Sequence, residues 1–170
     1  ITWLDGTSAG EKNCRALLES MVARGAAALN IIPDRNWNVA QPEERRLKQA
    51  NLMEVVTLAG LLGLPINIGT EMNKSGLPFV DDLAGEALRP HREAFQSGAR
   101  IMAGHTLLSR FAGFSYVGAA AAAQFFDVTE KNAFFEAVGN LPPMDADQAR
   151  RLEDMGPTRA MDWFWATASR

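Results

Sequence analysis

The first half of the chain alternates short apolar runs with longer stretches of helical periodicity. The predicted strands cover residues 1–4, 27–32 and 65–69. The predicted helices cover about 9–24 and 42–62, where apolar side chains recur at helical spacing and Gly25 and Gly63 mark the ends. This repeated order of strand, polar loop and helix is typical of βαβ units in a parallel sheet. The short apolar strands suit a sheet that is covered on both faces.

A helical pattern replaces the alternation after Gly76. A short helix is expected over 78–87 and a long one over 91–111. Further helices are predicted over 119–123, about 127–138, 145–155 and 157–169. We therefore predict the α/β class, with a parallel βαβαβ portion over 1–76 and a helical carboxyl-terminal portion of the same domain over 77–170.

Composition and charge narrow the class of protein. Hydrophobic residues make up 47% of the chain, which is enough for a packed core. The net charge of −3 argues against the basic surface of a nucleic-acid-binding protein. The single cysteine, Cys14, excludes an internal disulfide and suits a reducing compartment, so we expect a cytoplasmic protein. No apolar run approaches the roughly 20 residues that span a bilayer, so no membrane association is expected.

A cluster of polar residues follows each predicted strand. Asp5 follows the first strand, a dense group over 34–38 follows the second, and Glu71, Asn73 and Lys74 follow the third. In parallel α/β folds the carboxyl ends of neighbouring strands share one edge, where ligands bind. We therefore expect these side chains to converge on one site.

The residue types in these clusters suit hydrolytic chemistry on a small polar, anionic substrate. Carboxylates bind metal ions or transfer protons, so we predict Glu71 and Asp34 as catalytic residues, and Glu71, Asp34 and Asp5 as ligands of a divalent metal ion. Cationic and amide side chains recognise anionic groups. The predicted substrate-binding residues are Arg35, Asn36, Asn38, Asn73 and Lys74.

The same residues also have a purely structural interpretation. The segment from Asp5 to Ser8 has the composition of a helix cap, and Asp34 and Asn36 are residue types that form turns. Both interpretations stay open at this point, because polar side chains also occur in loops that only connect elements.

Three further residues with reactive side chains are given structural interpretations. Cys14 is expected to be a small buried residue, and His105 a partly buried histidine inside the long helix. His91 is either a residue on the rim of the site or a surface residue beside Arg89 and Arg92.

The run from Leu64 to Asn73, LPINIGTEMN, followed by a long helix and several short ones, resembles the closing part of a metal-dependent hydrolase (β/α)-barrel. The amidohydrolase and PHP-type phosphoesterase families are the nearest. In such barrels the last strand often ends in an acidic residue that binds metal or acts as a base, and Glu71 has that place. The chain departs from the pattern in having Glu where these families usually have Asp, and in having no histidine directly after a predicted strand.

This resemblance implies a partial TIM barrel. A full barrel needs about 250 residues, so three βα units and a helical tail suit the carboxyl-terminal part of one. The expected partner is then the missing amino-terminal part of the same chain, which would carry the histidine ligands, or a second copy in a homo-oligomer.

An alternative function is a non-catalytic binding domain. The helical portion is rich in aromatic side chains, which mark an interface when they are exposed together. They are Phe111, Phe114, Tyr116, Phe125, Phe126, Phe134 and Phe135. In this interpretation they dock a partner or the missing half of the chain, while the cluster Trp163–Trp165 docks the last helix.

Overall fold

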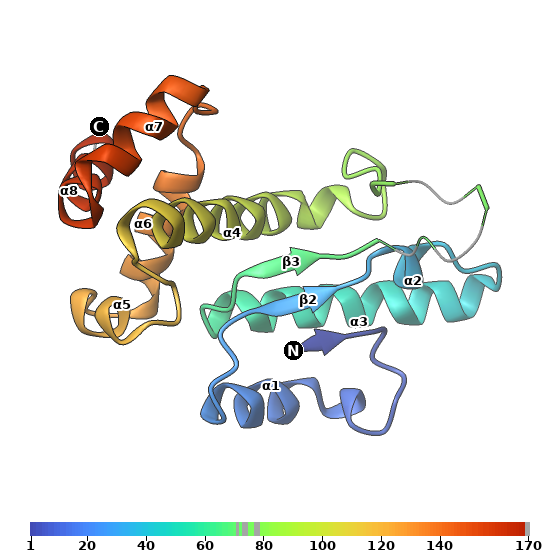
Figure 1. Ribbon diagram of the computed structural model, residues 1–170. Coiled ribbons are helices and arrows are strands. Elements are labelled where there is room, and N and C mark those ends of the chain that lie inside the picture. Colours follow the sequence, from blue (N-terminus) through green and yellow to red (C-terminus); the bar gives the residue numbers. More distant parts are fainter. Residues whose placement is uncertain (71, 73–74, 77–78, 169–170) are drawn as a thin grey trace. The chain divides into compact units, whose positions relative to one another are not determined.

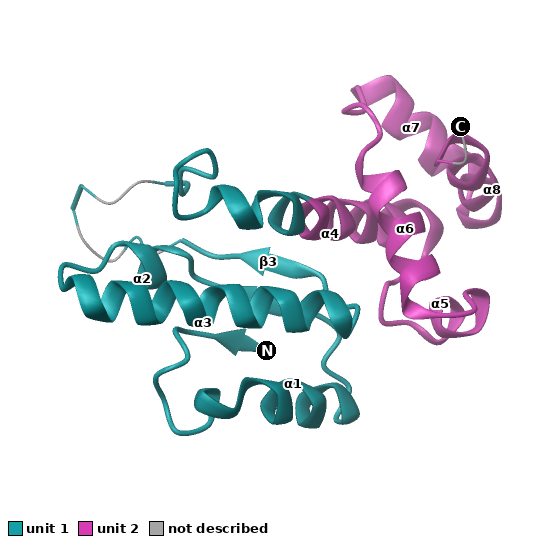
Figure 2. Ribbon diagram, turned by 180° about the vertical axis from the view of Figure 1, so that it is seen from behind, with its two compact units in different colours: residues 1–96 teal, residues 97–170 magenta. Residues whose placement is uncertain are grey.

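The computed structural model describes residues 1–70, 72, 75–76 and 79–168. Helices dominate it, and a small parallel sheet lies in the first part of the chain (Figure 1). The chain divides into two compact units, unit 1 (Ile1–Gln96) and unit 2 (Ser97–Arg170), and the boundary falls inside the long helix α4 (Figure 2).

Unit 1 contains a three-stranded parallel sheet, as the alternating pattern predicts. Its strands are β1 (Thr2–Trp3), β2 (Leu29–Ile31) and β3 (Ile66–Ile68), in the order β1-β2-β3. All three strands run in the same direction (Figure 1). The segments that follow them therefore start at one edge of the sheet, which is the geometry that the predicted site requires.

The helices of unit 1 begin and end close to the predicted positions. They are α1 (Cys14–Ala23), α2 (Asp34–Trp37) and α3 (Pro42–Leu61), with 3-10 turns η1 (Glu11–Asn13) and η2 (Arg89–His91). The Asn13 side chain accepts a hydrogen bond from the Ala16 amide and caps α1. Pro42 occupies the first turn of α3, with Glu43 and Glu44 where carboxylates suit the helix dipole.

The two crossover helices lie on the same face of the sheet and contact each other. Leu18 of α1 and Leu52 of α3 are fully buried in one core together with Leu29 and Ile31 of β2. Phe95, in the first turn of α4 (Arg92–Ala112), belongs to the same core. A strand order that follows the chain, with successive crossover helices on one face, is the arrangement of a singly wound sheet.

The opposite face of the sheet is polar. Thr2, Asn30 and Asn67 are in register across the three strands, and Asn67 Nδ2 donates a hydrogen bond to Asn30 Oδ1 at 3.0 Å. Thr2 and Asn67 are exposed. The expectation that the strands are covered on both faces is therefore wrong for these residues, because apolar and polar side chains alternate along β2 and β3.

The second part of the chain is helical, as predicted. After α4 come α5 (Ala119–Gln124), α6 (Val128–Gly139), α7 (Ala146–Met155) and α8 (Pro157–Ala168). Asp127 caps α6 by accepting a hydrogen bond from the Glu130 amide. Asp145 caps α7 in a reciprocal capping box with Gln148.

One predicted helix is absent from the described residues. Residues 79–88 form bends and turns instead of the helix expected over 78–87. Asp82 Oδ1 accepts a hydrogen bond from the Ala84 amide at 2.9 Å, and a side chain that bonds the nearby backbone in this way favours a turn over a helix.

Within the described ranges, no helix combines the length and apolar character that a bilayer crossing requires.

Candidate functional site at the carboxyl edge of the sheet

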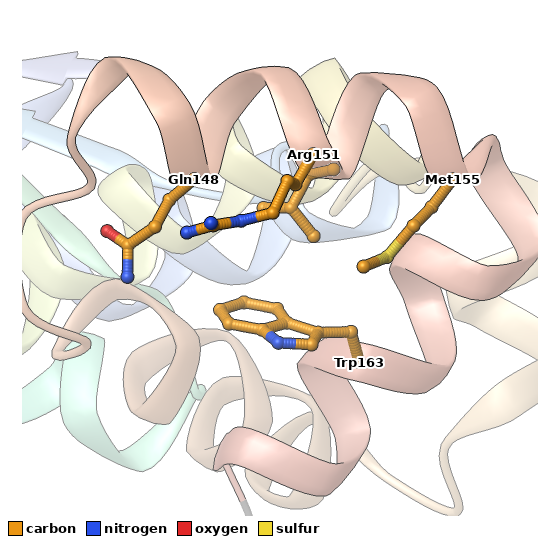
Figure 3. Close-up of a pocket in the computed structure, with 5 residues that line it drawn as sticks. Gln148, Arg151, Met155 and Trp163 are labelled. Carbon is orange, nitrogen blue, oxygen red and sulfur yellow. The ribbon is translucent and has the colours of Figure 1, made fainter.

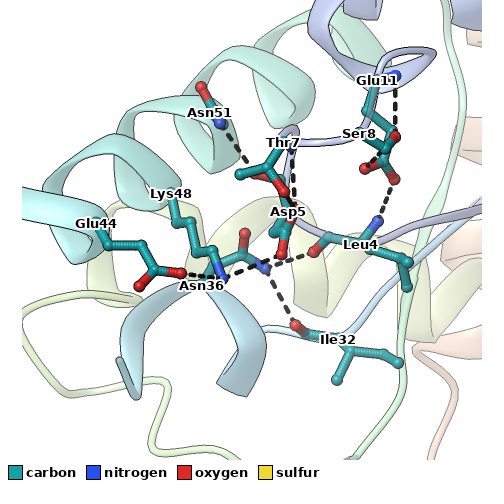
Figure 4. A network of polar contacts seen from close by, with 10 residues as sticks. All are labelled: Leu4, Asp5, Thr7, Ser8, Glu11, Ile32, Asn36, Glu44, Lys48 and Asn51. Atoms are coloured by element: carbon teal, nitrogen blue, oxygen red, sulfur yellow. Dashed lines mark hydrogen bonds and ion pairs between the residues drawn. The ribbon is translucent and has the colours of Figure 1, made fainter. Parts of the chain in front are cut away.

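Asp5 is the centre of a polar network at the end of β1 (Figure 4). Its Oδ1 accepts hydrogen bonds from the Thr7 hydroxyl at 2.6 Å and the Thr7 amide at 3.0 Å. Its Oδ2 lies 3.1 Å from Lys48 Nζ, which also lies 2.9 Å from Glu44 Oε1. The Asp5 carbonyl accepts a hydrogen bond from Asn51 Nδ2 at 2.9 Å. Two residues of α3 and the loop after β1 therefore hold Asp5 in one position.

The protonation states of Asp5 and Lys48 follow from this network. Burial alone raises the pKa of Asp5, but the hydrogen bonds from Thr7 and the Lys48 ammonium outweigh it, and the net pKa lies below its usual value. The hydrogen bond to Glu44 raises the pKa of Lys48. Burial lowers this pKa, and the neighbouring Asp5 carboxylate raises it further. Both groups are therefore charged at neutral pH, and Lys48 provides a fixed cation beside Asp5.

The loop after β1 is closed by a second set of contacts. Ser8 Oγ donates to Glu11 Oε2 at 3.0 Å, and Glu11 Oε1 accepts a hydrogen bond from the Leu4 amide at 2.7 Å. Gly6 has φ +76°, and a Cβ there would lie 2.6 Å from Asn51 Nδ2. Ser8 and Glu11 thus hold this loop together, whereas Asn13 caps α1 and Asp5 faces Lys48.

Asn36 connects the ends of β1 and β2. It is fully buried, and its Nδ2 donates to the Leu4 carbonyl at 3.0 Å and to the Ile32 carbonyl at 3.1 Å. Its Oδ1 is buried without a hydrogen-bond partner among the described residues. Leaving such an acceptor unpaired costs about 1–3 kcal/mol.

The cluster after β2 forms the single helical turn α2. Asp34 Oδ1 accepts a hydrogen bond from Asn38 Nδ2 at 2.9 Å. The indole N–H of Trp37 donates to Asp81 Oδ1 at 2.8 Å and ties α2 to the segment that precedes α4. Burial raises the pKa of Asp81, and the negative charge of Asp34 raises it further, while the Trp37 hydrogen bond opposes both. The charge of Asp34 therefore acts on the carboxyl group of Asp81.

A groove of about 710 Å³ lies beside this turn. It is formed by Trp37, the first half of α3 and the segment that leads into α4. Its wall on α3 includes Arg45, Arg46 and Gln49, and the facing segment contributes Glu86 and His91. Arg45 is held in place because its guanidinium donates to the carbonyls of Val39 and Ala40. A groove of this size accommodates a small-molecule ligand.

The structure brings some of the predicted site residues together and leaves others apart. Asp5 and Asn36 lie in one network, and Asp34 and Asn38 contact each other in α2 and its cap. Arg35 is half-buried and has a partner of its own. Three further predicted residues lie outside the described residues: Glu71, Asn73 and Lys74.

The predicted metal ligands do not form a metal site among the described residues. Both carboxylate oxygens of Asp5 already have partners, and Lys48 supplies the positive charge there. No group of three or more His, Cys, Asp or Glu side chains that suits a metal ion is found in the described ranges. The observed donors thus do not fit a divalent ion at Asp5, and the assignment of Glu71 and Asp34 as ligands stays a prediction.

Two residues of this edge escaped sequence reasoning. Lys48 lies in α3, one turn after Glu44, and its spacing alone indicates only a pair on a helix surface. Asp81 is 44 residues from its partner Trp37, and nothing local predicts that contact. Only the long-range packing of unit 1 brings these side chains to the strand ends.

The other reactive side chains largely match their structural interpretations. Cys14 is buried, and burial raises the pKa of its thiol to about 11. His105 is half-buried, and its Nδ1 accepts a hydrogen bond from the Tyr116 amide at 3.2 Å. His91 is buried, so the surface interpretation is wrong, and burial lowers the pKa of its ring.

Most of the aromatic side chains of the helical portion pack among themselves. Phe134 stacks on Trp165 with ring centroids 3.8 Å apart, which docks α8 within unit 2. Five of the seven aromatics proposed as a docking surface are buried: Phe111, Tyr116, Phe125, Phe134 and Phe135. Phe126 is exposed. The docking surface on which the alternative function depends is therefore reduced mainly to Phe126.

A small pocket in unit 2 lies between α7 and α8, where the side chain of Arg151 extends over the ring of Trp163 (Figure 3). Its volume is about 100 Å³, well below that of a typical ligand site. The groove in unit 1 is therefore the stronger candidate for a ligand-binding site.

In comparisons with known proteins, no family model, curated protein or solved structure matched the chain.

Proposed function

We propose that unit 1 is part of a (β/α)-barrel enzyme that hydrolyses a small, polar, anionic substrate at the carboxyl edge of its sheet. The observation that carries the proposal is the parallel, sequential order β1-β2-β3 with both crossover helices on one face. A singly wound sheet of this kind is the repeating part of a barrel, and barrel enzymes bind substrates where the strands end.

The resemblance to metal-dependent hydrolases supports the same reaction class. Asp34 and Asp81 supply a carboxylate pair whose members differ in environment, since Asp81 is buried and Asp34 is half-buried. In the proposed reaction Asp34 takes a proton from the attacking water as the water oxygen bonds to the substrate, and it gives that proton to the leaving group as the scissile bond breaks. Burial raises the pKa of Asp81, which accepts the Trp37 indole hydrogen bond. Lys48 and Asp5 hold the neighbouring loop in place, and no step is assigned to a metal ion.

The test is hydrolysis by the chain of a panel of anionic esters, amides and phosphomonoesters, with and without added Mn²⁺ or Zn²⁺. We expect Asp34→Asn and Glu71→Gln each to lower kcat/KM by about 100-fold or more, because general acid–base groups contribute at least that much. Asp147→Asn, in exposed α7, is the matched control and should leave turnover unchanged. Turnover that survives both substitutions would overturn the proposal, as would no turnover of any substrate in the panel.

A further inference from the structure

The groove in unit 1 has walls of opposite charge. Arg45 and Arg46 project from the first half of α3, whereas Asp82 and Glu86 lie on the segment that leads into α4. The lining also includes the apolar surface of Trp37. The groove therefore presents cationic side chains from α3 and anionic side chains from the segment before α4 to a ligand.

The charges at the two walls are available to a ligand. Arg46 and Glu86 are both exposed, and neither side chain forms an ion pair or hydrogen bond in the part of the chain that the structure describes. Arg45 is anchored by the carbonyls of Val39 and Ala40, so the cationic wall is partly ordered before a ligand binds.

The apolar part of the groove is also held in place. The indole of Trp37 is fixed by its hydrogen bond to Asp81 at 2.8 Å. His91 is buried against Phe95, with ring centroids 5.9 Å apart, and burial favours its neutral form. The groove therefore offers a flat apolar surface with a cationic wall and an anionic wall, and His91 adds little charge to either at neutral pH.

We propose that this groove binds a zwitterion of about dipeptide size, with its carboxylate at Arg46, its ammonium at Glu86 and an apolar or aromatic side chain on Trp37. A purely anionic ligand would face repulsion from Glu86 and Asp82, whereas a zwitterion satisfies both walls. Arginine binds carboxylates through paired N–H groups, and a carboxylate accepts hydrogen bonds from an ammonium. The volume of about 710 Å³ suits a ligand larger than one amino acid.

This inference goes beyond the proposed function: it gives the groove a zwitterionic ligand, whereas the proposed hydrolysis acts on an anionic substrate at Asp34, which is not part of the groove lining. Binding is therefore tested apart from turnover. The probes are glycyl-phenylalanine, its N-acetyl derivative and its carboxamide, titrated into the whole chain by calorimetry. The indole N–H resonance of Trp37, assigned through Trp37→Phe, locates the binding.

We expect each capped derivative to bind about tenfold or more weakly than the free dipeptide. Arg46→Gln should remove the preference over the carboxamide but keep the preference over the N-acetyl form, and Glu86→Gln should do the reverse. Arg24→Gln and Glu43→Gln change exposed residues outside the groove lining and are the matched controls, in which both preferences should remain.

The outcomes separate the two proposals. Binding with these preferences but without hydrolysis supports the zwitterion site and overturns the proposed function. Hydrolysis of anionic substrates without dipeptide binding supports the proposed function and overturns the zwitterion site. Equal affinity for free and capped forms, or no shift of the Trp37 resonance, overturns the zwitterion site.

Discussion

The ammonium of Lys48 and the carboxylate of Asp5 lie 3.1 Å apart, although 43 residues separate them in the chain. Both side chains are largely shielded from solvent, with exposed fractions of 14% and 11%. The pair joins the loop after β1 to the first half of α3. It therefore determines how one end of the sheet meets the helix that forms a wall of the groove.

A double-mutant cycle on Asp5→Asn and Lys48→Met should show a coupling free energy of about 1–3 kcal/mol, measured by denaturant unfolding. The control is the exposed pair Arg15 and Glu19, one turn apart in α1, for which about 0.5 kcal/mol or less is expected. Equal coupling in the two cycles would show that burial does not strengthen the Asp5 pair.

Acid should weaken the contribution of Asp5 in a defined pH range. The pKa of Asp5 in the folded chain is below the ordinary value of 3.8, so its contribution to stability is fully present above 3.8 and is lost as the pH falls from there through the lower pKa of the folded chain. Comparison of the free energy of unfolding of the natural chain and Asp5→Asn from about pH 6 to pH 2.5 measures this loss. A constant difference over that range would contradict the expectation.

His91 should make the chain less stable in mild acid. Burial lowers the pKa of its ring in the folded chain, so the unfolded chain binds a proton first as the pH falls below about 6.5. The free energy of unfolding should therefore decrease between about pH 7 and pH 5. His91→Gln should reduce this dependence of the free energy of unfolding on pH. An unchanged dependence would show that other groups cause it.

Close packing of α4 against α6 should make two glycines intolerant of a side chain. A Cβ on Gly104 would lie 1.9 Å from the Phe135 carbonyl oxygen, and one on Gly139 would lie 1.7 Å from the Arg100 carbonyl oxygen. Because backbone atoms cannot rotate away, each substitution to alanine should destabilise the chain by about 2 kcal/mol or more.

The control for this prediction is Gly60→Ala in α3, where an added Cβ meets nothing within 4 Å. Alanine favours a helix over glycine, so this variant should be more stable by up to about 1 kcal/mol. Thermal unfolding of the three variants measures the difference. Similar melting temperatures for all three would contradict the close contact.

Cys14 should react slowly with thiol reagents in the folded chain. It is buried in the core of unit 1, and its pKa of about 11 leaves very little thiolate at neutral pH. Modification by a disulfide reagent should be slow without denaturant and complete within minutes in about 6 M guanidinium chloride, where the core is unfolded. Fast modification of the native chain would show that α1 opens readily.

The local pattern of apolar, polar, proline and glycine residues was sufficient to predict most of the secondary structure. Pro42 and Gly63 delimit α3 because proline suits a first helical turn and glycine suits the left-handed position after the C-cap, Leu62. The short apolar runs became parallel strands because βαβ units are the common way to bury them. The turn over 79–88 was missed because Asp82 bonds to the backbone of Ala84, an interaction that periodicity does not report.

The sequence by itself determined that a parallel sheet forms and that polar residues gather where its strands end. Hydrophobic periodicity and helix caps act between residues that are close in the chain, so a local sequence pattern contains them. Only the tertiary structure decided that Asp5 faces Lys48, that Trp37 contacts Asp81 and that arginines and acidic residues form opposite walls of one groove. Those partners are tens of residues apart, and the packing of helices on the sheet brings them together.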